Sequence, residues 1–159
     1  MKSILSFILF LSLFVLCTSD QEDQTKMELT IRMQGKPSCK MSKVIDNSQS
    51  CVQYAFDQDN RMFIIKHVNA AFNCCPDSIW CTIVYRNDTI IIQEFEKNFG
   101  CKCECLYDLN LEISGLEPEK YCLKFVEPYS EDQDQLCFPI DLTDQKQGEY
   151  CVTRFLYPW

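Results

Sequence analysis

The cysteines constrain the fold of this chain more than any other feature of its sequence. Twelve of the 159 residues are cysteine, a density that indicates disulfide bonds in an exported protein and metal sites in a cytosolic one. One of them, Cys17, lies in an N-terminal leader. The other eleven are Cys39, Cys51, Cys74, Cys75, Cys81, Cys101, Cys103, Cys105, Cys122, Cys137 and Cys151. Because their number is odd, at least one thiol must be free, bonded to another chain or bound to a ligand.

The leader predicts export. Residues 1–19 have the pattern of a signal peptide, with a positive charge before an apolar run from Ile4 to Leu16 that is too short to span a bilayer. Cleavage at the end of the leader would release a chain that begins with an acidic tether at residues 20–26. Alternatively, the residues up to Cys17 resemble a bacterial lipobox, and Cys17 would then carry a lipid anchor. Leu16 favours release, because lipoprotein processing needs a small side chain at that place. We expect a protein that is secreted or attached to the cell envelope, without a transmembrane span.

The chain is acidic. Its 15 basic and 23 acidic residues give a formal net charge of −8 at pH 7. Such a chain gains little from binding nucleic acid or an anionic membrane, so we expect neither as a partner. Residues 27–159 are predicted to form a single domain, long enough to bury about two-thirds of the surface of the unfolded chain.

Nine segments have the length and composition of β-strands, and turn residues separate them. Because no segment shows a sustained apolar period of about 3.6 residues, we predict an all-β protein with two packed sheets. The predicted strands are Met27–Met33, Cys51–Phe56, Met62–Val68, Ile79–Arg86, Thr89–Glu96, Cys103–Ile113, Tyr121–Val126, Leu136–Asp141 and Tyr150–Leu156.

Two local patterns predict more detail. Asn87 and Asp88 tolerate the left-handed conformations of a two-residue hairpin turn. The resulting register pairs Arg86 with Thr89, Val84 with Ile91, Trp80 with Phe95, Tyr85 with Ile90, and Ile83 with Ile92. Further on, a Leu-x-Pro turn ends at Tyr121, which resembles the tyrosine corner of immunoglobulin and fibronectin type III domains. The fold class that we predict is an immunoglobulin-like or fibronectin III-like β-sandwich, stapled by disulfides.

Two cysteine clusters stand out. In an extended strand, Cys101, Cys103 and Cys105 would share the inward face of Tyr107, Leu109, Leu111 and Ile113. Cys74 and Cys75 are adjacent, and adjacent cysteines are better suited to separate partners than to each other. We predict that they bond to two of the three cysteines in 101–105, with Cys81 or Cys151 taking the third. Two further pairs are expected, Cys39 with Cys51, and Cys122 with Cys137 if their strands are neighbours.

Two alternatives stay open for these clusters. The first is a thiolate site for Zn(II) or Cu(I). Its ligands would be Cys74, Cys75, Cys101, Cys103 and Cys105, with His67 nearby. The second is a redox role for the Cys74–Cys75 pair, although the chain lacks a Cys-x-x-Cys motif.

No catalytic residues can be selected. His67 is the only histidine, and a single histidine at a strand end is usually a hydrogen-bonded structural residue. No Gly-x-Ser-x-Gly motif or phosphate-binding glycine loop occurs. The scattered carboxylates Glu94, Glu96, Asp108, Glu112 and Asp141 have the pattern of a solvated face. We therefore expect no enzyme and no cofactor, and we expect the aromatic residues 155–159 to pack across the open end of the sandwich.

Several blocks together resemble a known family. They are the segment 67–76, the strand that begins Cys101-x-Cys-x-Cys, Glu127-Pro128-Tyr129, and the segment from Cys151 to Trp159. They resemble an uncharacterised family of small exported bacterial proteins, many of them lipoproteins. The resemblance covers residues 51–159 and implies a location in the bacterial cell envelope, but it implies no activity.

These observations predict a binding or structural module. The partner would be an unknown protein or glycan at the cell envelope. The alternatives are a thiolate metal-binding protein of the envelope and, third, an exported thiol-redox protein.

Overall fold

The structure of the protein is a computed structural model that describes residues 27–40, 48–98, 100–130 and 133–156. The predicted signal peptide, the lipidation candidate Cys17, the acidic tether and the last three residues lie outside the described residues. Within the described ranges, no helix has the length and the apolar character that crossing a bilayer requires.

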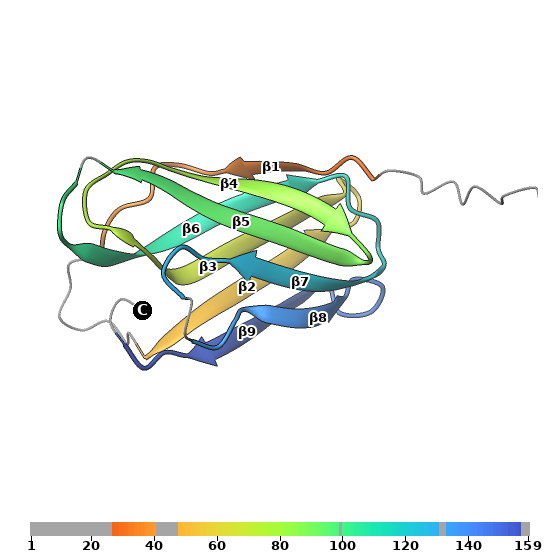
Figure 1. The fold of residues 1–159 in the computed structure, drawn as a ribbon. Helices are drawn as coiled ribbons and strands as arrows, with labels where there is room; N and C mark the ends of the chain where they lie inside the picture. Colours follow the sequence, from red (N-terminus) through yellow and green to blue (C-terminus); the bar gives the residue numbers. More distant parts are fainter. Residues whose placement is uncertain (1–26, 41–47, 99, 131–132, 157–159) are drawn as a thin grey trace, which may run out of the picture.

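The described residues form two β-sheets (Figure 1). The five-stranded sheet has the order β1 (Thr30–Met33), β6 (Glu104–Ser114), β3 (Met62–Asn73), β2 (Gln49–Asp57) and β9 (Gln147–Thr153). The four-stranded sheet has the order β4 (Pro76–Arg86), β5 (Thr89–Asn98), β7 (Lys120–Val126) and β8 (Cys137–Asp141). Each predicted strand corresponds to one of these elements, and the all-β class with two sheets is confirmed.

Alternation along the strands explains why the two sheets pack on each other. In β6, Cys105, Tyr107, Leu109, Leu111 and Ile113 are buried, and the residues between them are mostly more exposed. The four-stranded sheet contributes completely buried side chains to the same core. They include Ile90 and Ile92 of β5 and Leu123 of β7. A period of two residues therefore directs one face of each sheet into a shared core.

The β4–β5 hairpin has the predicted register. Arg86 pairs with Thr89, Val84 with Ile91 and Trp80 with Phe95. Asn87 and Asp88 have φ angles of 49° and 55°, the left-handed values that this two-residue turn requires. The prediction succeeded because both the turn and its flanking pairs are local in the sequence.

The turn between β6 and β7 contains the predicted tyrosine corner. The Tyr121 hydroxyl donates a hydrogen bond to the carbonyl oxygen of Glu117 at 3.1 Å, the backward contact that defines this motif. Neighbouring strands are antiparallel throughout both described sheets except for β5 and β7, which are parallel. The constant immunoglobulin domain, in contrast, has two antiparallel sheets of four and three strands.

Strand β3 is longer than expected, and this changes where the cysteines lie. Asn69 has a φ of 63° and shifts the register between Val68 and Ala70, so the strand continues past this bulge to Asn73. The Asn69 side-chain amide donates a hydrogen bond to the Gln49 carbonyl oxygen at 2.8 Å, which anchors the bulge to β2. Cys74 and Cys75 consequently lie in a tight connection between β3 and β4 at the end of the sandwich.

The C-terminal segment differs from its prediction. Phe155 is 77% and Leu156 67% exposed, so these two side chains do not close the end of the sandwich. Arg154, the residue before them, is buried and binds Glu127. The inward anchor of this segment is therefore a charged residue rather than an aromatic one.

Candidate functional site

Four disulfide bonds join eight of the described cysteines. They are Cys39–Cys105, Cys51–Cys151, Cys74–Cys103 and Cys75–Cys101. The prediction that Cys74 and Cys75 bond to two cysteines of the 101–105 segment is confirmed. We call these two bridges, together with Asn73, the cysteine corner.

The predicted bridge between Cys39 and Cys51 is wrong. Cys39 bonds to Cys105 with a Cα–Cα distance of 5.7 Å, because its segment runs beside β6 and Lys40 donates a backbone hydrogen bond to Leu106. Cys51 lies opposite Cys151 in the β2–β9 pair, with a Cα–Cα distance of 4.1 Å. The third cysteine of the 101–105 segment is thus taken by Cys39, and not by Cys81 or Cys151.

Of the three cysteines in the 101–105 segment, only Cys105 points inward. Cys105 is 2% exposed within β6, whereas Cys101 and Cys103 are exposed. Strand β6 begins at Glu104, so the alternation that buries Cys105 does not extend to the two residues before the strand. Cys101 and Cys103 are consequently accessible to solvent, although their partners are half-buried.

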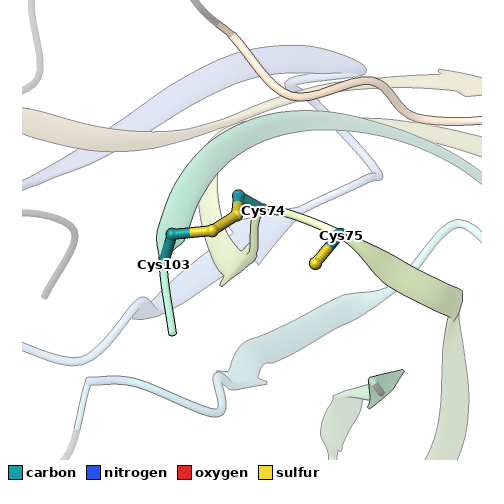
Figure 2. A group of neighbouring side chains, drawn as sticks. All are labelled: Cys74, Cys75 and Cys103. Atoms are coloured by element: carbon teal, nitrogen blue, oxygen red, sulfur yellow. A yellow bond between two sulfur atoms is a disulfide. The ribbon is translucent and has the colours of Figure 1, made fainter. Parts of the chain in front are cut away.

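Hydrogen bonds hold the cysteine corner together independently of its bridges. The Asn73 side-chain amide donates to the Cys101 carbonyl at 2.7 Å, and the Cys74 amide donates to the Cys103 carbonyl at 3.0 Å. Asn73 Oδ1 accepts from the Cys75 amide at 3.0 Å. The sulfur atoms of Cys74, Cys75 and Cys103 lie within 4.8 Å of one another (Figure 2). The two segments are therefore fixed so that the sulfurs cluster.

The cysteine corner does not include His67. Its two ring nitrogens lie 2.6 Å from Glu94 Oε1 and 2.9 Å from Ser50 Oγ, inside the sandwich. The structure therefore separates His67 from the five cysteines that the sequence grouped with it as possible metal ligands.

Three described cysteines have no disulfide bond. Cys122 and Cys137 lie on the outer face of the neighbouring strands β7 and β8, as predicted, but their sulfurs are 3.6 Å apart and do not form the predicted bridge. Cys81 faces inward opposite Glu94, and burial followed by the charge of Glu94 raises the pKa of its thiol. A raised pKa keeps the thiol protonated, so Cys81 is a poor nucleophile.

A buried polar network crosses the core. His67 of β3 contacts Ser50 of β2 and Glu94 of β5, and so links the two sheets. Beside it, Arg154 binds both carboxylate oxygens of Glu127 at 2.6 and 2.7 Å, and Glu127 Oε1 lies 3.7 Å from His67 Nε2. These five residues are at most 8% exposed.

The geometry of this network is that of a serine–histidine–carboxylate triad, but its place in the fold gives it another role. A catalytic serine must reach a substrate, whereas Ser50 and His67 are completely buried. In this structure the network connects the sheets through charged hydrogen bonds instead. Removing one member of such a buried ion pair is expected to be strongly destabilising.

The network shifts the pKa values of His67 and Glu94. Burial disfavours a charged imidazole, but the charge and hydrogen bond of Glu94 and the charge of Glu127 outweigh it, so the pKa of His67 is raised. Burial also raises the pKa of Glu94, against the opposing charge and hydrogen bond of His67. Glu94 Oε2 is buried without a hydrogen-bond partner among the described residues. His67 and Glu94 therefore hold the proton between them more tightly than an isolated imidazole would, and the pair titrates as a unit.

The sequence pattern did not predict this network, although the chain contains a signal for it. The confirmed hairpin register, extended by two residues, puts Glu94 on the inward face with Ile90 and Ile92. Glu94 was instead grouped with solvated carboxylates because it is charged. An acidic residue in an otherwise apolar alternation was the indication of a buried partner.

The outer faces of the two sheets differ in charge. The outer face of the four-stranded sheet combines apolar side chains with four cations, and we call this surface the basic face. Its apolar side chains are Trp80, Val84, Ile91 and Phe95. The cations are Arg86, Lys97, Lys120 and Lys124, and the carboxylates at the rim are Asp77 and Asp141. The outer strand positions of the five-stranded sheet instead carry two cations and five carboxylates. They are Arg32, Lys66, Asp57, Glu104, Asp108, Glu112 and Glu149.

Two places on the described surface thus combine accessible and chemically distinctive side chains, the cysteine corner and the basic face. Comparison of the chain with family models, with curated proteins and with solved structures yields no match.

Proposed function

We propose that this protein is an exported binding module and that its ligand is an acidic polysaccharide, bound on the basic face. The observation that carries the proposal is that one sheet surface of an acidic chain combines an exposed tryptophan and its stacked phenylalanine with cationic side chains. The chain has a net charge of −8, yet the cations on the basic face outnumber its rim carboxylates. An acidic ligand would therefore be attracted to this face more than to the outer face of the five-stranded sheet.

The aromatic side chains of the basic face also favour a sugar ligand. Trp80 is 42% exposed and stacks on Phe95, with ring centroids 5.5 Å apart and planes inclined by 12°. Exposed aromatic rings offer an apolar surface against which the apolar face of a sugar ring can pack. Thr82 and Gln93 pair between Trp80–Phe95 and Val84–Ile91, so hydroxyl and amide groups adjoin the rings. Lys124 lies beside Ile91, where it could bind a uronate carboxylate.

The export part of the proposal rests on the cysteines and the leader. Four disulfides are typical of an oxidising compartment. The predicted signal peptide and the resemblance to exported bacterial proteins support a secreted or envelope-attached chain, with Cys17 as the possible lipid anchor. The tyrosine corner supports grouping the sandwich with immunoglobulin-like domains, and the parallel β5–β7 pair is its departure from them.

Affinity electrophoresis tests the ligand. Full-length mature protein is run in gels that contain polygalacturonate or alginate, with dextran as the neutral polymer. We expect retardation by an acidic polymer that weakens as salt is added, because screening reduces charge attraction. Trp80→Ala is expected to weaken the affinity about tenfold, and Lys124→Glu by at least as much.

The matched control is Ile64→Ala. Ile64 is 46% exposed on the outer face of the opposite sheet, so this variant removes a comparable apolar side chain away from the basic face, and its retardation should be unchanged. Equal retardation by dextran, or no retardation by either acidic polymer, contradicts the proposal. In the second case a protein ligand becomes the better explanation of the basic face.

A second candidate function is the binding of a soft ion such as Zn(II) or Cu(I) at the cysteine corner. Three sulfurs within 4.8 Å of one another suit a single tetrahedral ion. The sulfurs are bonded as disulfides, so metal binding requires that both bridges first be reduced. Metal analysis of protein purified without chelators tests this candidate, and metal-free protein with intact bridges contradicts it.

A further inference from the structure

We infer that the cysteine corner is a thiol–disulfide exchange site, in which reduction of one bridge lets the other bridge migrate. The inference is independent of polysaccharide binding. It rests on the position of Cys75, whose sulfur lies within 4.8 Å of both sulfurs of the neighbouring Cys74–Cys103 bridge (Figure 2). Thiol–disulfide exchange requires a thiolate that can reach a disulfide sulfur.

The exchange begins at an exposed atom. Cys101 is exposed, whereas its partner Cys75 is half-buried. An external thiolate attacks the Cys101 sulfur, forms a mixed disulfide with it and expels Cys75 as a thiolate. A second external thiol attacks the mixed disulfide, which gives the oxidised external disulfide and a free Cys101 thiol. The two external thiols are oxidised by two electrons in total, and one protein bridge is reduced.

The freed Cys75 thiolate then has a specific target. Attack on the Cys103 sulfur forms a Cys75–Cys103 bond and expels Cys74 as a thiolate, with no net oxidation or reduction. Attack on Cys74 would instead close a strained ring between adjacent residues. The migrating bridge is therefore expected to join Cys75 to Cys103.

The fold keeps the reacting atoms together during this exchange. Asn73 donates to the Cys101 carbonyl, and Cys74 donates to the Cys103 carbonyl. Neither hydrogen bond depends on a disulfide. Opening one bridge therefore leaves the 73–75 segment against 101–103, which keeps the effective concentration of the attacking thiolate high.

The other half-exposed bridge of the structure lacks this arrangement. Cys51 and Cys151 are joined across β2 and β9, and the third potential ligand beside them is the Glu149 carboxylate rather than a sulfur. No third described cysteine lies in that group. The Cys51–Cys151 bridge is therefore the matched control for exchange.

The test is disulfide mapping of the Cys101→Ser variant. This change leaves a Cys75 thiol beside the Cys74–Cys103 bridge. The full mature chain is incubated without oxygen at about pH 8, where thiolate is available, and is then quenched in acid, alkylated and mapped by mass spectrometry. We expect Cys74–Cys103 and Cys75–Cys103 bridges in amounts within about tenfold of each other, since the two bonds are chemically equivalent. In Cys151→Ser, the thiol that the substitution releases should stay entirely at Cys51.

Two outcomes would overturn the inference. One is a thiol found only at Cys75 with the Cys74–Cys103 bridge unchanged. The other is equal scrambling in both variants, which would indicate general misfolding. If Cys101→Ser does not fold, the wild-type protein is treated with one equivalent of a reducing dithiol and trapped. A Cys75–Cys103 bridge in the singly reduced protein supports the inference, and its absence contradicts it.

Discussion

At the residue scale, the stability of the fold depends most on how the charged groups around His67 are buried and paired. A completely buried imidazole lies between two buried carboxylates, and Arg154 compensates one of them. Buried charges are costly unless each is paired and hydrogen-bonded. The members of the network come from both sheets and from the segments that follow β7 and β9, so the network forms only when the two sheets pack together.

The network predicts a pH dependence of stability. The pKa of His67 is raised above its usual 6.5 by Glu94 and Glu127 against the effect of burial. The protonated ring therefore stabilises the fold fully below 6.5, and this contribution is lost as the pH rises through the folded-state pKa. We expect the free energy of unfolding to fall as the pH rises above about 6.5. Urea denaturation at a series of pH values measures it.

The control for this prediction is Glu94→Gln. It keeps a polar side chain beside His67 but removes the larger of the two charges that raise its pKa. Burial then favours the neutral ring, and the fall in stability over this range should disappear. The thiols of Cys81 and Cys122 also have raised pKa values. They lower stability only near and above about pH 9, where thiols of the unfolded chain ionise, so the comparison is made below about pH 8. A variant with the same slope as the wild-type protein would show that another group causes it.

At the element scale, the turn between β6 and β7 offers a second test. The Tyr121 hydroxyl bonds to the Glu117 carbonyl, and the side chain is 3% exposed. We expect Tyr121→Phe to lower the free energy of unfolding by about 1 kcal/mol, the usual value of one such hydrogen bond. Tyr85→Phe is the control, because its hydroxyl bonds to Asp88 at the exposed end of the hairpin. Equal losses in both variants, measured by urea denaturation, would contradict a specific role for the corner.

The elements also show what could be predicted from the sequence and why. The hairpin register and the tyrosine corner were correct because each depends on residues close in the chain. The pairing of β2 with β9 joins residues as far apart as Cys51 and Cys151, and no local pattern contains it. The Cys39–Cys51 bridge was wrong for that reason.

The candidate sites follow the same division. Two short segments contain the cysteine corner, so its membership could be predicted, although the individual pairs could not. The extension of β3 through the Asn69 bulge placed the corner, and a left-handed asparagine within an apolar run gives no clear warning of it. The basic face required the arrangement of three strands, of which the sequence supplied only the hairpin.

At the scale of the whole molecule, the bridges and the charges have separate positions. Three bridges tie residues 39, 74 and 75 to the 101–105 segment, while the fourth joins β2 to β9 in the same five-stranded sheet. The basic face belongs to the other sheet (Figure 1). Cys75 directly precedes β4, so the corner adjoins the Asp77–Lys97 end of the basic face and not the hairpin end that carries Arg86.

The most direct test of this account is disulfide mapping of the wild-type protein, alkylated in its native state and analysed together with its metal content. We expect Cys39–Cys105, Cys51–Cys151, Cys74–Cys103 and Cys75–Cys101, no bound metal, and a Cys81 thiol that reacts only after unfolding because it is inward-facing with a raised pKa. Reduced thiols at Cys74, Cys75, Cys101 and Cys103 with a stoichiometric metal ion would contradict the account.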